Sequence, residues 1–241
     1  MLIRWIRGLY YTDRSVKIRM RFCIMRINRM SADFGKSMVM NMERASIAEI
    51  REKVKKTQDK KRYEHTLGVT YTAACLAMCY DIDTERAETA GLLHDCAKCL
   101  SNDKKVSLCK KQSIEINMTE AKNPFLLHAK AGAYLAEHKY GIRDEDILNA
   151  VRYHTTGRPG MSMLEKIVFI ADYIEPGRNH SVRLPELRRL AFQDLDKALV
   201  EILRDTLRYL RGTDHEIDPM TQKTYDYYKK ELAKRDDMKS V

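Results

Sequence analysis

The chain has 241 residues, of which 44% are hydrophobic and 32% charged, and its formal net charge is +10. This length is sufficient for one substantial hydrophobic core, and the composition is ordinary for a globular protein. No apolar run approaches the roughly 18 residues of a membrane-spanning helix, so we exclude a membrane protein and expect a cytoplasmic one.

The positive charge is concentrated in the first 40 residues, which hold nine Lys and Arg side chains against two Asp. That segment carries +7, so the remaining 201 residues carry only +3. Seven of the 13 Met residues lie within the first 42, as expected if translation begins near Met40 or Met42. We therefore predict that residues 1–41 are a basic extension outside the fold, either disordered or an over-long reading of the gene. A nucleic-acid-binding arm is the remaining alternative, and we expect no stable nucleic-acid binding.

The six cysteines do not predict a disulfide framework or a zinc site. Cys96 and Cys99 form one CxxC pair, and Cys75 and Cys79 lie four residues apart. A single CxxC without a matching second pair is weak evidence for zinc. Because the chain is neither short nor signalled for export, we expect reduced thiols in the cytoplasm.

From residue 42 onward the sequence predicts consecutive amphipathic helices separated by short breaks. Ser46, Asp83 and Asp144 are candidate N-caps, and Gly141 is a candidate helix end. Helices are expected at about 46–57, 61–80, 83–94, 102–112, 125–140, 144–154, 162–174, 184–192, 194–211 and 219–235. No stretch alternates convincingly with the period of two that a strand requires. The predicted fold class is therefore all-α, a single helical bundle of about 9–11 helices spanning residues 42–241.

Six side chains that can bind a metal ion fall on the predicted inner faces of five helices. His65, for example, precedes Val69, Thr72 and Leu76 at helical spacing, which places it on a buried stripe. A lone buried histidine is usually a hydrogen-bonded core residue, but a buried aspartate needs a partner. One cation centre satisfies all six together, and its predicted ligands are His65, His94, Asp95, His128, His154 and Asp172.

Imidazole and carboxylate ligands together suit a divalent Fe, Mn, Zn or Co ion rather than Ca. Four of the ligands are predicted to hold one ion, and His128 and His154 a second one, with the Asp95 carboxylate bridging the two. Such a pair of ions can activate a water for in-line displacement at phosphorus. If only one ion binds, His128 and His154 would instead contact phosphate or relay a proton.

Positively charged and hydroxyl side chains adjoin the proposed ligands, as a substrate with several negative charges requires. A Gly/Pro turn after His154 brings hydroxyls, a guanidinium and backbone N–H groups together. The predicted substrate-binding residues are Lys98, Thr155, Thr156, Arg158 and Arg178, and the predicted catalytic residues are Asp95, Lys98, His128 and Arg158.

Three runs of residues carry a resemblance to a known family. They are His94-Asp95-Cys96-Ala97-Lys98, His154-Thr155-Thr156-Gly157 and the run from Glu165 to Arg178. With the order of the six ligands, they resemble the HD-domain metal-dependent phosphohydrolases over about residues 45–235. Within that superfamily they are most similar to the YqeK family of bacterial symmetrical diadenosine tetraphosphate hydrolases. The resemblance implies a helical HD domain, cleavage of diadenosine tetraphosphate (Ap4A) into two ADP, and iron or a similar divalent metal as cofactor.

Other functions remain open at this point. The same ligands could serve another nucleotide or a phosphodiester, because they prescribe metal-assisted phosphoryl chemistry but not the base. The chain could instead be a non-enzymatic nucleic-acid-binding or ribosome-associated protein that uses its basic N-terminus. A dinuclear iron oxygenase is a more distant alternative, which the cationic residues disfavour. The sequence does not determine the oligomeric state, and a homodimer is compatible with it.

Overall fold

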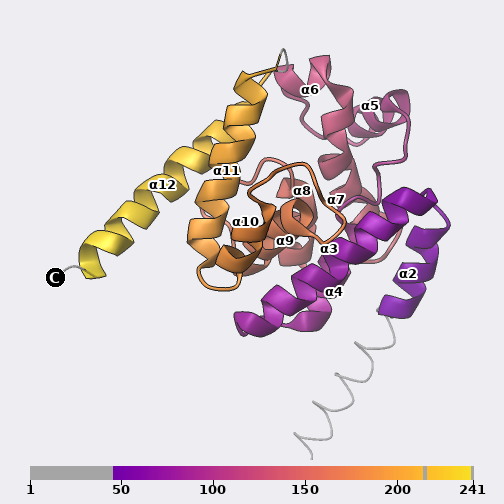
Figure 1. Cartoon of the computed structure of the whole chain (residues 1–241). Coiled ribbons are helices and arrows are strands. Elements are labelled where there is room, and N and C mark those ends of the chain that lie inside the picture. Colours follow the sequence, from indigo (N-terminus) through magenta and orange to yellow (C-terminus); the bar gives the residue numbers. More distant parts are fainter. Residues whose placement is uncertain (1–45, 214–215, 240–241) are drawn as a thin grey trace, which may run out of the picture. The chain divides into compact units, whose positions relative to one another are not determined.

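The computed structural model describes residues 46–213 and 216–239, and the predicted basic extension, residues 1–41, lies outside them. Within the described residues the chain forms eleven α-helices, one 3₁₀ helix and no strand (Figure 1). The helices are α2 (Ile47–Lys55), α3 (Lys60–Cys79), α4 (Thr84–Leu93), α5 (Asn102–Lys111), α6 (Met118–Lys122), η3 (Pro124–Leu127), α7 (His128–His138), α8 (Glu145–Tyr153), α9 (Met163–Ile174), α10 (Leu184–Ala191), α11 (Leu195–Arg211) and α12 (Pro219–Lys239). The predicted all-α fold is confirmed. No helix in this part of the chain is both long and apolar enough to cross a bilayer.

Most helices begin where the sequence supplies a capping side chain. The Ser46 hydroxyl accepts a hydrogen bond from the backbone N–H of Glu49, and the Glu49 carboxylate accepts one from the N–H of Ser46. Asp83 and Asp144 accept N–H bonds from the first turns of α4 and α8. In α5 the cap is Ser101, one residue earlier than predicted. These caps satisfy N–H groups that have no partner within their own helix.

The structure differs from the sequence prediction in the segment between α5 and α7. A short helix, α6, was not predicted, and it is held by a reciprocal pair of hydrogen bonds between Asn117 and Glu120. The single helix expected over 125–140 is divided, because Pro124 begins the tighter turn of η3 and α7 starts only at His128. A 3₁₀ turn winds more tightly than an α-helix, so the regular α-helical hydrogen bonding begins only with α7. The junction places His128 at a helix end.

The core is built around α9, which is buried on almost every side. Its buried residues are Leu164, Glu165, Ile167, Val168, Phe169, Ile170, Ala171 and Ile174. Helices α3, α8, α10 and α11 pack against α9, which lies among them in Figure 1. Helix α12 is fastened to the segment before α9 by Tyr228, whose hydroxyl accepts the N–H of Met161 at 2.7 Å. A polar residue carried by α9, such as Asp172, is thereby placed in the middle of the helical bundle.

Helices α3 and α4 approach closely because small residues line their contact. Ala87, Ala90 and Gly91 of α4 are fully or almost fully buried. A Cβ atom at Gly91 would lie only 2.8 Å from the Cα atom of Thr70 on α3. The two backbones therefore come closer than a larger residue would allow, and the end of α4 reaches the part of α3 that carries His65.

We expect Gly91→Ala to destabilise the protein. Its new methyl group meets backbone rather than a movable side chain, so α3 and α4 must separate, at a cost of about 1–3 kcal/mol. The measurement is the free energy of unfolding in urea, with the protein free of metal. Gly132→Ala on α7 is the matched control, since its Cβ would meet the side chain of Val151 at 3.3 Å. Equal costs for the two variants would contradict a backbone contact as the cause.

Candidate metal centre

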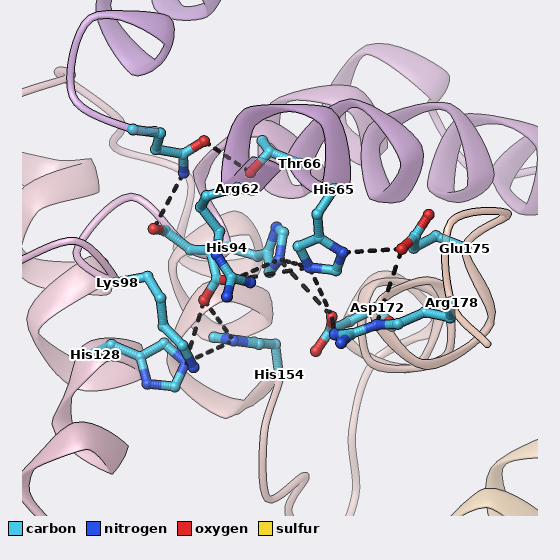
Figure 2. Close-up of polar contacts among 12 residues, drawn as sticks. Arg62, His65, Thr66, His94, Lys98, His128, His154, Asp172, Glu175 and Arg178 are labelled. Carbon is cyan, nitrogen blue, oxygen red and sulfur yellow. Dashed lines mark hydrogen bonds and ion pairs between the residues drawn. The ribbon is translucent and has the colours of Figure 1, made fainter. Parts of the chain in front are cut away.

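The six predicted ligands lie together at one place in the bundle (Figure 2). They come from five segments that are distant in sequence: α3, the end of α4, the start of α7, the end of α8, and α9. His94, Asp95, His128 and His154 are buried, whereas the side chains of His65 and Asp172 are partly exposed, at 10% and 21%. The prediction that one centre gathers these residues agrees with their positions.

The ligand atoms form two groups of three. His65, His94 and Asp172 make up the first group, which we name the α3 triad, and Asp95, His128 and His154 make up the second, the α7 triad. Within each triad all candidate ligand atoms lie within 4.8 Å of one another. A distance of this order lets one ion reach three ligands at about 2 Å each.

Asp95 faces both triads with different oxygen atoms. Its Oδ1 lies 3.2 Å from Nε2 of His128 and 3.6 Å from Nε2 of His154. Its Oδ2 lies 3.6 Å from Nε2 of His94 and 3.9 Å from Nε2 of His65. The carboxylate is therefore positioned between the triads, which is the geometry that the sequence prediction of a bridging Asp95 requires.

Three of the four histidines are oriented by backbone carbonyls near helix ends. Nδ1 of His94, His128 and His154 donates to the carbonyl oxygen three residues earlier, at 2.7, 2.8 and 2.7 Å respectively. The carbonyls that orient His94 and His154 lie in the last turns of α4 and α8, where helical N–H partners run out. The carbonyl that orients His128 belongs to Phe125 and also accepts the backbone N–H of His128. The proton on Nδ1 leaves Nε2 of each neutral ring with its lone pair exposed.

These lone pairs point at one another. Nε2 of His128 lies 3.2 Å from Nε2 of His154, and Nε2 of His94 lies 3.3 Å from Nε2 of His65. Oδ1 of Asp95 is also buried without a hydrogen-bond donor. Facing lone pairs and a buried carboxylate oxygen without a donor are costly unless a cation lies between them. The residues present therefore fit a divalent metal centre.

The electrostatic environment keeps the ligands in the forms that bind metal. Burial lowers the pKa of His94 and of His128 to about 4, so both rings are neutral at physiological pH. Burial by itself would raise the pKa of Asp95 and Asp172, but their polar and charged neighbours, which for Asp172 include the guanidinium of Arg178, hold both values below the usual range. Metal ligation requires neutral imidazole and ionised carboxylate.

Three cationic side chains surround the centre, and two of them were predicted. Lys98 places Nζ 3.2 Å from Nε2 of His128, and burial lowers the pKa of its ammonium group. Arg178 donates from Nη2 to Oδ1 of Asp172 at 2.6 Å. Arg62 was not predicted, and its Nη1 donates to Oδ2 of Asp95 at 2.7 Å. Because Arg62 precedes His65 by three residues on a helix, the shared helical face was a signal that could have found it.

The predicted residues of the turn after α8 have other partners. Arg158 forms a two-pronged ion pair with Glu165, from Nε at 2.9 Å and Nη2 at 2.6 Å, and its guanidinium lies over the ring of Tyr153. The Thr156 hydroxyl donates to the carbonyl of Gly157. Thr155 forms no hydrogen bond or ion pair among the described residues. The roles of this turn in substrate binding stay predictions.

A cavity of about 700 Å³ adjoins the α3 triad. Its walls are the first half of α3, including Arg62 and His65, and the loop over residues 175–180, including Arg178. Pockets of this size hold drug-sized ligands. The two arginines that contact metal-ligand carboxylates therefore also line a space large enough for part of a nucleotide.

Sequence reasoning also missed two residues that support the ligands. Glu175 accepts a hydrogen bond from Nδ1 of His65 at 3.1 Å (Figure 2). Gln58 donates from Nε2 to the backbone carbonyl of Asp95 at 3.2 Å and accepts from the hydroxyl of Thr66. Glu175 lies in the run from Glu165 to Arg178, three residues after Asp172, but nothing in that run indicates that its side chain turns back to α3.

Comparisons with known proteins place these observations in a family. Residues 62–177 match the HD domain. The chain is 40% identical over 174 residues to the symmetrical bis(5'-nucleosyl)-tetraphosphatase of Bacillus subtilis (strain 168), covering 72% of this chain and 92% of that protein. It is 37% identical over 191 residues to the protein of the same name from Staphylococcus aureus (strain NCTC 8325 / PS 47), covering 78% and 95%. A crystal structure described as a predicted HD superfamily hydrolase involved in NAD metabolism, from Clostridium acetobutylicum, is 42% identical with a TM-score of 0.75, covering 78% of this chain and 99% of that one.

The helical fold, the two triads and the matched domain define an HD-domain protein, a class whose shared chemistry is metal-dependent phosphohydrolysis. Within that class the chain belongs to the family of the symmetrical bis(5'-nucleosyl)-tetraphosphatases, because it matches two such proteins over more than nine-tenths of their lengths. The resemblance inferred from the three sequence runs is confirmed.

We expect Asp95→Asn and Asp172→Asn to differ in how many metal ions they lose. Asp172 belongs to the α3 triad alone, whereas Asp95 faces both triads, so its replacement weakens both positions. The measurement is metal per chain by elemental analysis, after reconstitution with Mn²⁺ and removal of excess ion. The control is Asp144→Asn, which breaks an ion pair with Arg86 away from the centre. Loss of one ion in both site variants would argue against Asp95 as the shared ligand.

Proposed function

We propose that this chain is a divalent-metal-dependent hydrolase that cleaves Ap4A symmetrically into two molecules of ADP. The observation that carries the proposal is the Asp95 carboxylate, which lies between two triads whose imidazole lone pairs converge. The names of the relatives and the cationic cavity beside the α3 triad support the nucleotide substrate. The donor set fits Fe, Mn, Co or Zn, and iron is proposed as the native ion.

The proposed metal centre would supply Lewis acidity at phosphate oxygens and would lower the pKa of a water molecule to near neutrality. His65, His94 and Asp172 would hold one ion, and His128 and His154 a second, with Asp95 shared between them. The chain's own residues do the remaining work of binding, orienting and neutralising the polyphosphate. If a single ion binds, His128 and His154 contact phosphate instead.

The cations are divided between the two sides of Asp95. Lys98 lies by the α7 triad, while Arg62 and Arg178 lie by the α3 triad at the edge of the cavity. Cleavage between the second and third phosphates of Ap4A produces two identical halves, each with two phosphates. A polyphosphate centred on Asp95 would therefore meet a cation on each side. Lys98 Nζ is proposed to stabilise the negative charge on one departing ADP.

The turn after α8 keeps a proposed part in substrate binding. Thr155 and Thr156 carry hydroxyls beside His154, and Arg158 is held by Glu165 rather than by the centre. Arg158 would have to exchange this partner for phosphate before it could act in catalysis.

We place the enzyme in the cytoplasm, where nucleotides are made and thiols stay reduced, because the five described cysteines are all free.

A second candidate substrate is another nucleotide, since the ligands do not select the base. The solved relative from Clostridium acetobutylicum is titled a hydrolase of NAD metabolism, and NAD also contains a phosphoric anhydride. Parallel assays with Ap4A, NAD, deoxynucleoside triphosphates and cyclic dinucleotides separate these candidates by kcat/KM.

Deleting residues 1–41 separates the enzyme from a nucleic-acid-binding protein, because hydrolysis should persist without the basic segment.

Replacement of both His94 and Asp95 by Ala is expected to abolish hydrolysis and metal binding together. The double variant removes one ligand from the α3 triad and the shared carboxylate. Products from Ap4A are separated by anion-exchange chromatography, and wild-type protein should yield ADP alone, without ATP and AMP. An ATP-plus-AMP product in the wild type, or ADP formed at the wild-type rate by the double variant, would refute the proposal.

Arg178→Ala is expected to raise the KM for Ap4A by about tenfold or more, as loss of a charge-assisted contact of about 1.5–3 kcal/mol implies. Arg158→Ala should change KM less, because Arg158 is paired with Glu165 and lies outside the cavity lining. The exposed Arg143, which pairs with Glu137, provides the matched control and should leave the kinetics unchanged. A larger effect at Arg158 than at Arg178 would move the phosphate site to the turn after α8.

A further inference from the structure

We propose that Glu175 is a positioning residue that orients His65 for metal binding and joins the α3 triad to the loop that lines the substrate cavity. The inference rests on the proposed metal-dependent function. It concerns a residue that touches neither the metal position nor the reacting phosphates, and it acts through His65.

His65 needs a partner that the other three histidines do not need. His94, His128 and His154 lie at helix ends, where the carbonyl three residues earlier accepts the Nδ1 proton of each ring. His65 lies inside α3, which spans Lys60–Cys79, so the carbonyls of the preceding turn are occupied by helical N–H groups. Among the described residues, Nδ1 of His65 bonds no carbonyl of α3, and Glu175 supplies its acceptor, 3.1 Å away.

Both oxygen atoms of Glu175 are committed to N–H donors. Oε1 accepts from Nδ1 of His65, and Oε2 accepts from the backbone N–H of Gly177 at 2.6 Å. The side chain is 5% exposed, so its charge is almost completely removed from water. A buried carboxylate is costly unless its hydrogen bonds are made, and Arg178 Nε adds a cation at 3.9 Å. Because both oxygens only accept, an amide in the same place could satisfy one donor but not both.

Two glycines make room for this carboxylate. A Cβ atom at Gly68 would lie 2.4 Å from Oε2 of Glu175, and one at Gly177 would lie 3.0 Å from it. Gly68 is three residues after His65 on the same face of α3. A glycine inside a helix costs up to about 1 kcal/mol relative to alanine, so this position gives up helix stability. The space that a side chain at position 68 would occupy is taken by the Glu175 carboxylate, which orients His65.

The backbone of the Glu175 loop is held from a separate direction. Arg188 on α10 donates from Nε to the carbonyl of Ile174 at 2.8 Å, and from Nη2 to the carbonyls of Glu175 and Arg178 at 2.9 and 3.0 Å. The loop is therefore fixed by α10 through its backbone and by α3 through the Glu175 side chain. Since the same loop carries Arg178, displacement of Glu175 changes the metal position and the cavity wall together.

The expected consequence is a loss of metal affinity at one position only. A carboxylate that accepts the Nδ1 proton makes Nε2 a stronger donor and fixes the tautomer, and loss of such a partner typically weakens metal binding about 10–100-fold. The α7 triad contains no atom bonded to Glu175 and should keep its affinity. A residue needed only for folding would not distinguish between the two triads.

The test is titration of the metal-free full-length protein with Co²⁺, followed by visible absorption, for wild type and Glu175→Gln. We expect one of two dissociation constants to rise about 10–100-fold and the other to stay within about twofold. Asp172→Asn shows which of the two constants belongs to the α3 triad. The double variant Asp172→Asn/Glu175→Gln should bind Co²⁺ at that triad no more weakly than Asp172→Asn alone. Glu120→Gln is the matched control, a buried glutamate on α6 whose bonds are to Asn117 and Lys130. It should lower the melting temperature and leave both constants unchanged.

Gly68→Ala tests the same inference without altering a charge. Its methyl group would displace the carboxylate from Nδ1 of His65, so the same Co²⁺ constant should rise. The proposal is overturned if Glu175→Gln binds two ions with wild-type affinity, or if both constants rise equally in Glu175→Gln and Gly68→Ala. These readouts do not use Ap4A. A selective Co²⁺ effect in a protein that fails to hydrolyse Ap4A would therefore refute the proposed substrate and leave the role of Glu175 standing.

Discussion

The structure depends on a repulsive arrangement at its centre: one buried carboxylate among imidazole nitrogens whose lone pairs face one another. His128 and His154 approach to 3.2 Å, His65 and His94 to 3.3 Å, and Oδ1 of Asp95 has no donor. A protein interior does not tolerate such groups without a compensating charge. A bound divalent ion converts each repulsion into ligation, and its binding free energy then adds to the stability of the fold. The large apolar surface around α9 contributes the stability that keeps this centre assembled.

The bundle orients the ligands at little cost by using helix ends. The last carbonyls of a helix have few or no helical N–H partners, and three of the four histidines use a carbonyl near a helix end to fix the ring. His65 is the exception, and its position inside α3 explains why a buried glutamate and a helical glycine occur nearby. The cationic groups follow the same division into two sides, with Lys98 by one triad and the two arginines by the other. That division suits a substrate built of two equal anionic halves.

The residues that sequence reasoning found and missed differ in what they depend on. The six candidate ligands could be singled out because each is a polar side chain on an apolar helical stripe, which is a local pattern. Arg62 lies on the same face of α3 as His65, so its place was also available from spacing, although the signal was not used. Glu175 and Gln58 were missed because their roles depend on contacts between segments that are 110 and 37 residues apart. Arg158 lies in a Gly/Pro turn beside His154, where a phosphate-binding residue would be expected, yet its observed partner is Glu165 on the following helix, α9.

The sequence by itself determined the fold class, nearly all helix boundaries, the family and the six residues proposed as metal ligands. Periodicity, caps and short motifs are local properties, and they survive whatever the helices pack against. Only the tertiary structure decided how the ligands divide into two triads, which oxygen of Asp95 faces each, and where the cavity lies. It also decided that η3 separates from α7, which places the His128 ring where the carbonyl of Phe125 can orient it. These features follow from distances between helices, such as the close approach at Gly91, and no pattern within a single helix encodes such a distance.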